Sequence, residues 1–231
     1  MGRSFGIVEC KIAEAQFFIQ KLEEAAEDYH LLAARCYVSA FVSAARSITF
    51  TLKASIADIP NFKEWYDMHE NSMKNNPLAK YFLFARNESQ KVGYYPINGM
   101  GRFKDDDGIE KTNFYFDNYY PEQKELVPEI DAVTACKEYF KILLEVIYDC
   151  FKTFGALIDP DQYYTIENIR RLGKSVEDIE EEIGFPRGWT KMGGGTDEER
   201  IEAIRRKYST NSVDAILIEY LGKDRFGNIH V

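Results

Sequence analysis

Apolar residues follow helical spacing through the first quarter of the chain, and neither Gly nor Pro interrupts it from Glu9 to Ile59. One apolar stripe comprises Ile12, Ile19, Leu22, Ala26 and Tyr29, and a second comprises Tyr37, Phe41, Ala44, Ile48 and Leu52. Residues three, four and seven apart share one face of a helix. The pattern predicts helices at 9–27 and 30–57 with a break near Asp28, or a single helix kinked there.

Three further helices are marked by their apolar positions and by their ends. Pro60 permits a helix to begin after it, at 61–73. Asn76 followed by Pro77 is a strong helix start and Gly93 a typical helix end, which together frame a helix at 77–92. A helix at 132–156 is predicted from a long apolar face that contains Val133, Cys136, Phe140, Leu143, Ile147, Cys150 and Phe154.

Residues 94–128 are rich in turn-forming residues and aromatic side chains. The run Asp105-Asp106-Asp107-Gly108 predicts a hairpin turn between two short strands. Its acidic residues do not have the spacing of a calcium-binding loop, so a solvated turn is expected. The aromatic residues of the segment are expected to cover a helical bundle, with base stacking as the alternative.

The last part of the chain contains four short helical patterns, at 165–172, 176–184, 197–207 and 213–221. We therefore expect a mainly all-α protein: a helical bundle at 1–160 with a hairpin insertion at 94–128, and a helical C-terminal appendage at 161–231. The first two short helices have the outline of a helix-turn-helix. The second of them carries five acidic residues, so DNA binding by this element is disfavoured.

The charge of the chain is unevenly distributed. There are 29 Lys and Arg residues against 38 Asp and Glu, a net charge of −9, which excludes a basic surface over the whole molecule. Residues 1–92 carry 11 basic and 11 acidic groups, whereas 93–160 carry 7 and 13, and 161–231 carry 11 and 14. A local basic cleft is therefore most readily formed by the first part of the chain.

The remaining composition narrows the class of protein. No apolar run approaches the roughly 18 residues needed to span a bilayer, and the first residues lack the features of a secretory signal. The four cysteines are widely separated and are expected to be reduced thiols in the core. With only His30, His69 and His230, a histidine metal site is not expected. We expect a cytoplasmic protein without metal, cofactor or membrane attachment.

The second predicted helix carries a line of basic residues. Arg35, Arg46 and Lys53 are separated by 11 and 7 residues and so share one side of the helix. This line is either an edge that is solvated or paired with carboxylates, or a row of phosphate contacts. The same helix has a face of small residues, which lets another helix approach closely within the bundle or across a dimer; they are Cys36, Ser39, Ala40, Ser43, Ala44 and Ser47.

A second polar group lies at the end of the helix predicted at 77–92. Arg86, Asn87 and Lys91 share one side of this helix, and Asn87 and Lys91 are four residues apart, so their polar ends are expected to meet. Arg offers a planar fork for phosphate, Asn can donate or accept a hydrogen bond, and Lys supplies a point charge.

These motifs carry a resemblance to a known family. A helical bundle with Arg86-Asn87 on a late helix and a basic group soon after resembles the HEPN superfamily, whose usual signature is Arg, four to six residues, then His. The small-residue run from Tyr37 to Ser47 also looks like a helix of bacterial HEPN-like proteins, and the resemblance covers about residues 10–156. It implies two protomers that share one cleft, and a metal-independent ribonuclease of a toxin–antitoxin, defence or RNA-processing system.

In this resemblance Arg86 corresponds to the phosphate-contacting Arg, and Lys91 stands at the position of the family's His. His is the usual general base near neutral pH, whereas Lys91 would instead stabilise charge on the phosphate. We expect a homodimer that binds or cleaves RNA, with Arg86, Asn87 and Lys91 as the catalytic group. Arg35, Arg46 and Lys53 would extend its RNA-binding cleft.

The rival expectation belongs to a different class of protein. It is a non-catalytic HEPN-like interaction protein whose acidic segment 161–231 binds a partner protein. The absent His and the net charge of −9 favour it.

Overall fold

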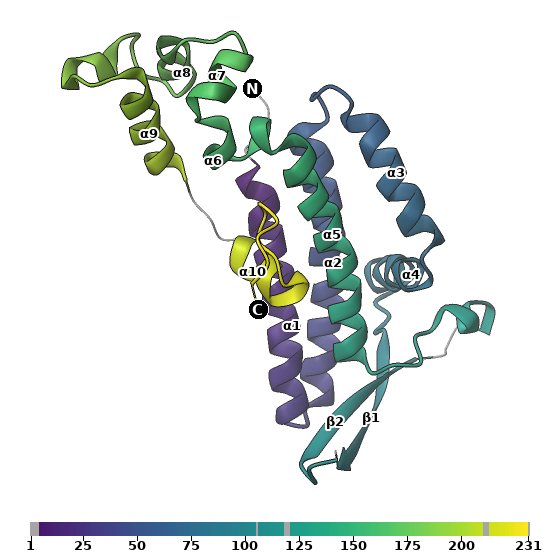
Figure 1. The fold of residues 1–231 in the computed structure, drawn as a ribbon. Helices are drawn as coiled ribbons and strands as arrows, with labels where there is room; N and C mark the ends of the chain where they lie inside the picture. Colours follow the sequence, from purple (N-terminus) through teal and green to yellow (C-terminus); the bar gives the residue numbers. More distant parts are fainter. Residues whose placement is uncertain (1–4, 105, 118–120, 210–212, 231) are drawn as a thin grey trace.

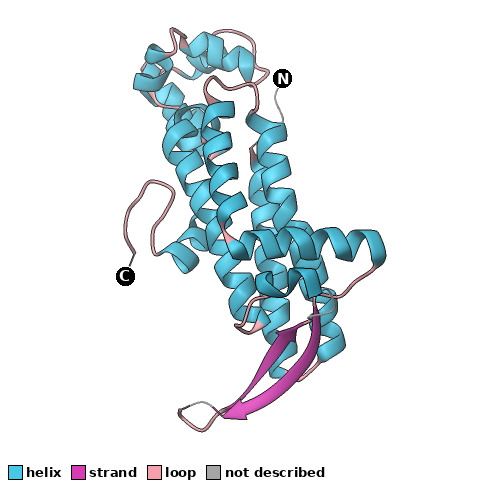
Figure 2. Ribbon diagram, turned by 90° about the vertical axis from the view of Figure 1, so that its right-hand side faces the viewer, coloured by secondary structure: helices cyan, strands magenta, loops and turns pink. Residues whose placement is uncertain are grey.

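The computed structural model describes residues 5–104, 106–117, 121–209 and 213–230. Within these ranges the chain is mostly helical, with a single two-stranded antiparallel sheet (Figure 2), which confirms the predicted mainly all-α fold. Asp105, the first residue of the predicted hairpin turn, lies outside the described residues.

Three long helices run side by side and form the core: α1 (Gly6–Glu27), α2 (Leu31–Ile56) and α5 (Ala132–Ile158) (Figure 1). The chain reverses between α1 and α2 at Tyr29, which has a φ of +53°, and the His30 side chain accepts a hydrogen bond from the N–H of Ala33 at 3.1 Å. Two separate helices therefore form, as the first of the two alternatives predicted. Among the fully buried side chains are Ile12, Ile19, Phe41, Phe140 and Ile147.

Among the described helices, α2 has the length and composition of a membrane-spanning segment, with a mean hydropathy of 1.2. In the structure it packs against α1, α4 and α5, and Val38, Phe41 and Leu52 are fully buried among them. A helix that packs against several neighbours needs apolar residues on more than one face, and 39% of the apolar window of α2 is buried in the bundle.

Helices α3 (Phe62–Asn75) and α4 (Pro77–Val92) lie against the long helices, and α4 crosses them steeply (Figures 1 and 2). The predicted ends of α4 are confirmed: the Asn76 side chain accepts from the N–H of Ala79 at 3.0 Å, and Gly93 ends the helix with a φ of +73°. Two contacts hold α3 in place. Lys53 of α2 pairs with Glu70 at 3.1 Å, and the Trp65 indole donates to Asp149 of α5 at 2.7 Å.

The predicted hairpin is formed by β1 (Ile97–Lys104) and β2 (Glu110–Phe116), followed by the short 3₁₀ helix η1 (Pro121–Leu126). Ile97, Phe114 and Phe116 are buried against the bundle, while the turn end of the hairpin projects away from it (Figure 1). The hairpin thus covers one end of the core through a few apolar residues at its base.

A second, smaller core lies beyond the end of α5. It is built by α6 (Pro160–Tyr163), α7 (Ile166–Arg171), α8 (Val176–Glu182), the 3₁₀ helix η2 (Trp189–Gly193) and α9 (Asp197–Tyr208). Its buried side chains are Ile169, Val176, Ile179, Ile201 and Ile204. Ser175 with Asp178, and Thr196 with Glu199, form reciprocal capping boxes at the starts of α8 and α9, as their spacing predicts.

The last helix, α10 (Val213–Leu221), does not join this second core but returns to the bundle. Val213, Ile216 and Leu217 are buried in the main core. The segment 161–231, which the sequence predicted to be one appendage, therefore contributes helices to both cores. The reason is that the apolar face of α10 is buried by α1 and α5.

The tail after α10 is fixed by Arg225, which is 4% exposed. Its guanidinium donates to Asp159 at 2.9 Å and to Asp214 at 3.2 Å, and it also pairs with Asp161. Because these carboxylates belong to the end of α5, to α6 and to α10, a single arginine joins the tail to the junction of the two cores.

All four cysteines were predicted to lie in the core, but the structure buries two of them. Cys136 and Cys150 are buried in α5, whereas Cys10 and Cys36 are exposed on α1 and α2. The helical stripes of the sequence account for this difference, because Cys10 and Cys36 fall between the apolar stripes of their helices.

Candidate phosphate-binding site

Helix α4 crosses α2 along the small residues that the sequence singled out. The Ser39 and Ser89 hydroxyls contact each other, and the Gln90 side-chain amide donates to the Ser43 hydroxyl at 3.0 Å. The small side chains of Ala44 and Ala85, both buried, let the two backbones approach. The serine side of the small-residue face is thus used within the bundle.

Arg86 and Asn87 lie half-buried at this crossing, on the last turns of α4. The Arg86 guanidinium donates to the Asn87 side-chain oxygen at 3.1 Å, and within the described part of the chain it has no carboxylate partner. Lys91 is exposed on the final turn and forms no hydrogen bond with either residue in the described ranges. The expected meeting of Asn87 with Lys91 is therefore not observed, and the three residues do not form one unit.

Arg46 of α2 lies by the first half of α4, where it lines a pocket with Ala79, Lys80 and Leu83. Its guanidinium stacks over the Phe50 ring at 4.4 Å and donates to the Thr49 hydroxyl at 3.3 Å. As with Arg86, no ion pair to Arg46 is found among the residues that the structure describes. Ala79 and Leu83 of α4 face Arg46 across a pocket, and Arg86 lies three residues beyond Leu83 on the helix.

The other two residues of the predicted basic line are occupied by structural contacts. Arg35 donates to the backbone oxygens of Ile97 at 3.2 Å and Asn98 at 3.4 Å and so fastens β1 to α2. Lys53 pairs with Glu70 and lies over the Tyr66 ring at 4.2 Å. The line of cations seen in the sequence is therefore divided. Within the described ranges, the Arg46 guanidinium donates to no side-chain oxygen except the Thr49 hydroxyl.

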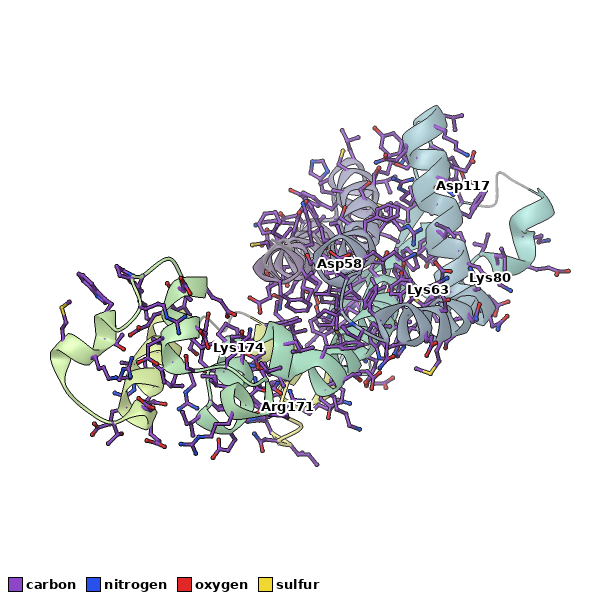
Figure 3. The ribbon with its side chains drawn as sticks, turned by 90° about the horizontal axis from the view of Figure 1, so that it is seen from above. Asp58, Lys63, Lys80, Asp117, Arg171 and Lys174 are labelled. Carbon is purple, nitrogen blue, oxygen red and sulfur yellow. The ribbon has the colours of Figure 1, made fainter. Side chains whose placement is uncertain are left out.

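The pocket beside Arg46 has a volume of about 140 Å³ and is enclosed by four helices. Buried walls are formed by Thr49, Ala79 and Tyr139, and the exposed rim by Lys74, Lys80 and Leu83; Arg46, Glu70 and Met73 complete the lining. Lys80 is labelled in Figure 3, where it lies with Lys63 on the side of the bundle away from Arg171 and Lys174 of the C-terminal helices.

Sequence reasoning missed Tyr139, Lys74 and Lys80 as members of this site. In the sequence, Tyr139 is indistinguishable from the other aromatic residues of a core helix. Lys74 and Lys80 resemble ordinary surface charges on either side of the helix start at Asn76-Pro77. The packing of α3 and α4 around Arg46 brings these three residues together. No local sequence pattern predicts that packing.

None of the histidines contacts Arg86, Asn87 or Lys91. His30 caps α2, and His69 pairs with Asp149 at 2.9 Å while its ring packs on Trp65 at 4.5 Å between centroids. His230 lies 3.3 Å from Asp224 in the tail. Over the described ranges, no group of three or more His, Cys, Asp or Glu side chains is arranged to hold a metal ion.

Comparison with known proteins corrects the family resemblance. A family model described as bacteriophage lambda protein ea47 matches residues 13–102, which span most of α1 through β1 but less than half of the chain. The HEPN resemblance was wrong, because the family that matches is a different one, over part of the residues that the resemblance covered. The motif on which the resemblance rested, Arg86-Asn87 followed by Lys91, is short and therefore of low specificity. The curated proteins and the solved structures contain no match to this chain.

Proposed function

We propose that this protein binds single-stranded RNA through phosphate contacts from Arg46 and Arg86. The observation that carries the proposal is that both arginines are half-buried, Arg46 on α2 and Arg86 on the neighbouring α4, and neither has a carboxylate partner among the described residues. A buried or half-buried arginine is usually paired, and its planar fork matches phosphate oxygens in a bidentate contact. The pair is thus available for an external oxyanion.

A single strand fits the surroundings of the two arginines better than a duplex does. Phe50, over which Arg46 stacks, is 48% exposed, and an exposed ring beside a cation is a typical surface for stacking an unpaired base. The net charge of −9 opposes the approach of a long, densely charged duplex. The proposed setting is the cytoplasm, where RNA is present.

The proposal is binding, with no cleavage step assigned to the site. Among the described residues Arg86 contacts Asn87 but neither a histidine nor Lys91, so neither of these groups is placed to move a proton at the proposed phosphate contact. General acid–base catalysis requires a group within hydrogen-bonding reach of the proton it moves.

The test is the affinity of the full chain for a labelled oligouridylate, measured by fluorescence anisotropy at low salt. Arg46→Ala and Arg86→Ala each remove a charge-assisted contact of about 1.5–3 kcal/mol, so each variant should bind at least about tenfold more weakly. Arg206→Ala is the matched control, because Arg206 is 78% exposed on α9 and makes only a surface pair with Glu202. Equal losses in all three variants, or no binding by the wild type, would reject the proposal and favour the rival interaction protein.

A further inference from the structure

Tyr139 is a buried aromatic residue whose hydroxyl has no hydrogen-bond partner among the described residues. Tyr139 is 7% exposed, its ring stacks on Phe82 with centroids 4.6 Å apart, and it meets Phe41 edge-on at 6.3 Å. These contacts fix the ring, yet its hydroxyl makes no hydrogen bond with any residue that the structure describes, although it borders the pocket beside Arg46. The hydroxyl of an otherwise buried tyrosine usually has a hydrogen-bond partner, so this donor on the pocket wall is available to a ligand in the pocket.

The hydroxyl remains a donor at neutral pH. Burial raises the pKa of Tyr139 to about 12, and the positive charge of Arg46 opposes this rise without cancelling it. An anion that enters the pocket therefore meets an O–H group on the inner wall and a guanidinium beside it.

The charge of the lining favours a dianion. Three cations, Arg46, Lys74 and Lys80, face a single carboxylate, Glu70. Glu70 is already held by Lys74 at 2.7 Å and by Lys53 at 3.1 Å, and these hydrogen bonds lower its pKa, so it stays ionised. The lining thus carries two net positive charges, and a phosphate monoester carries about −1.5 to −2 at neutral pH.

The shape of the pocket favours a phosphate at the end of an RNA strand over one within the strand. Thr49, Ala79 and Tyr139 close its inner side, so a group must enter and leave by the rim at Lys80 and Leu83. An internal phosphodiester continues on both sides and does not fit such a closed pocket, whereas a terminal phosphate does. A volume of about 140 Å³ accommodates a phosphate group with little more than part of its ribose.

We infer that the pocket between α2, α3, α4 and α5 receives the terminal phosphate monoester of an RNA strand, held by Arg46, Lys80 and the Tyr139 hydroxyl. This inference rests on the proposed function and adds the end-group that the protein selects. From the rim at Leu83, the strand continues along α4 toward Arg86, three residues away on the helix.

A second tyrosine provides the control for this argument. The Tyr220 hydroxyl likewise makes no hydrogen bond among the described residues, and it is itself buried; Tyr220 borders a different hollow, where Glu138 and Glu145 outnumber Lys141. That lining repels an anion. Tyr220→Phe therefore makes the same chemical change as Tyr139→Phe at a site without the predicted ligand.

The experiment compares three oligouridylates of one sequence, with a phosphate at the 5′ end, at the 3′ end or at neither end. The wild type should bind one of the phosphorylated strands about tenfold more tightly than the unphosphorylated strand. Tyr139→Phe and Lys80→Ala should reduce this ratio to about twofold or less. Tyr220→Phe and Lys63→Ala, whose lysine lies on α3 outside the pocket, should retain it.

The outcomes separate this inference from the proposed function. Equal affinity of the wild type for all three strands would overturn the terminal-phosphate pocket and leave RNA binding standing. Calorimetric titration with inorganic phosphate and with a phosphoserine peptide tests whether the pocket binds a phosphate that does not belong to RNA. Binding of the peptide, without RNA binding, would overturn both proposals. Loss of the RNA end preference in Tyr220→Phe as well as Tyr139→Phe would also overturn the inference.

Discussion

Arg225 joins the tail to the junction of the two cores, and its removal gives a sharp test of the structure. In Arg225→Met an apolar side chain of similar length replaces the guanidinium, and Asp159, Asp161 and Asp214 lose their shared cation. Arg225 and Asp159 are each 4% exposed, so the pair is shielded from water and salt. Breaking a buried pair by removing one partner costs about 3–5 kcal/mol, because the other charge is left unpaired.

This loss can be measured by thermal and urea unfolding of the full chain. For a protein of this size, 1 kcal/mol shifts Tm by about 2–4 °C, so the expected decrease is about 6–20 °C. Arg206→Met is the matched control, because its exposed pair with Glu202 is expected to contribute about 0–1 kcal/mol. If Arg225→Met lowered Tm no more than Arg206→Met, the arginine would not join the tail to the two cores as described.

Two further predictions concern α10 and the second core. Leu217→Ala should lower the free energy of unfolding by about 2–5 kcal/mol in a urea titration, because Leu217 is fully buried in the main core. The control is Ala215→Ser at an exposed position of the same helix, which should change the free energy of unfolding by less than about 0.5 kcal/mol. At the fully buried Glu180, burial alone would raise the pKa, but hydrogen bonds from Thr190, Arg200 and Gly188 outweigh it and lower the pKa to about 2. Because this value lies below that of the unfolded chain, the carboxylate stabilises the fold above about pH 4.5, and the stabilisation, on the order of 3 kcal/mol, is lost as pH falls toward 2. Circular dichroism melts should therefore show Glu180→Gln less stable than the wild type at pH 7, with the difference shrinking below about pH 4.5; a constant difference would contradict this account.

Local signals in the sequence were sufficient to predict most of the helices. Asn76, Pro77 and Gly93 act through the backbone of their own neighbourhood, so the bounds of α4 could be placed to the residue. The capping boxes at Ser175 and Thr196 are equally local, because each joins two residues three positions apart. Tertiary placement was not predictable in this way. The apolar face of α10 is evident in the sequence, but nothing local indicates that it packs on α1 and α5.

The candidate site shows the same limit. Helical spacing grouped Arg86 with Asn87 and Lys91, yet residues that share a helix face need not touch, and Lys91 does not contact the others. Spacing also grouped Arg35 with Arg46. In the structure, however, Arg35 donates a hydrogen bond to the hairpin, which lies more than sixty residues later in the chain. The pocket depends on α3 and α4 folding around Arg46 and Tyr139. That arrangement is a property of packing across four helices.

The salt dependence of RNA binding tests the central claim most directly, because it counts phosphate contacts. For a single strand, the slope of the logarithm of the binding constant against the logarithm of salt concentration is about −0.7 for each phosphate neutralised. The double variant Arg46→Ala/Arg86→Ala should therefore bind with a slope shallower than that of the wild type by about 1.4. A slope equal to that of the wild type would show that the two arginines do not contact RNA phosphates.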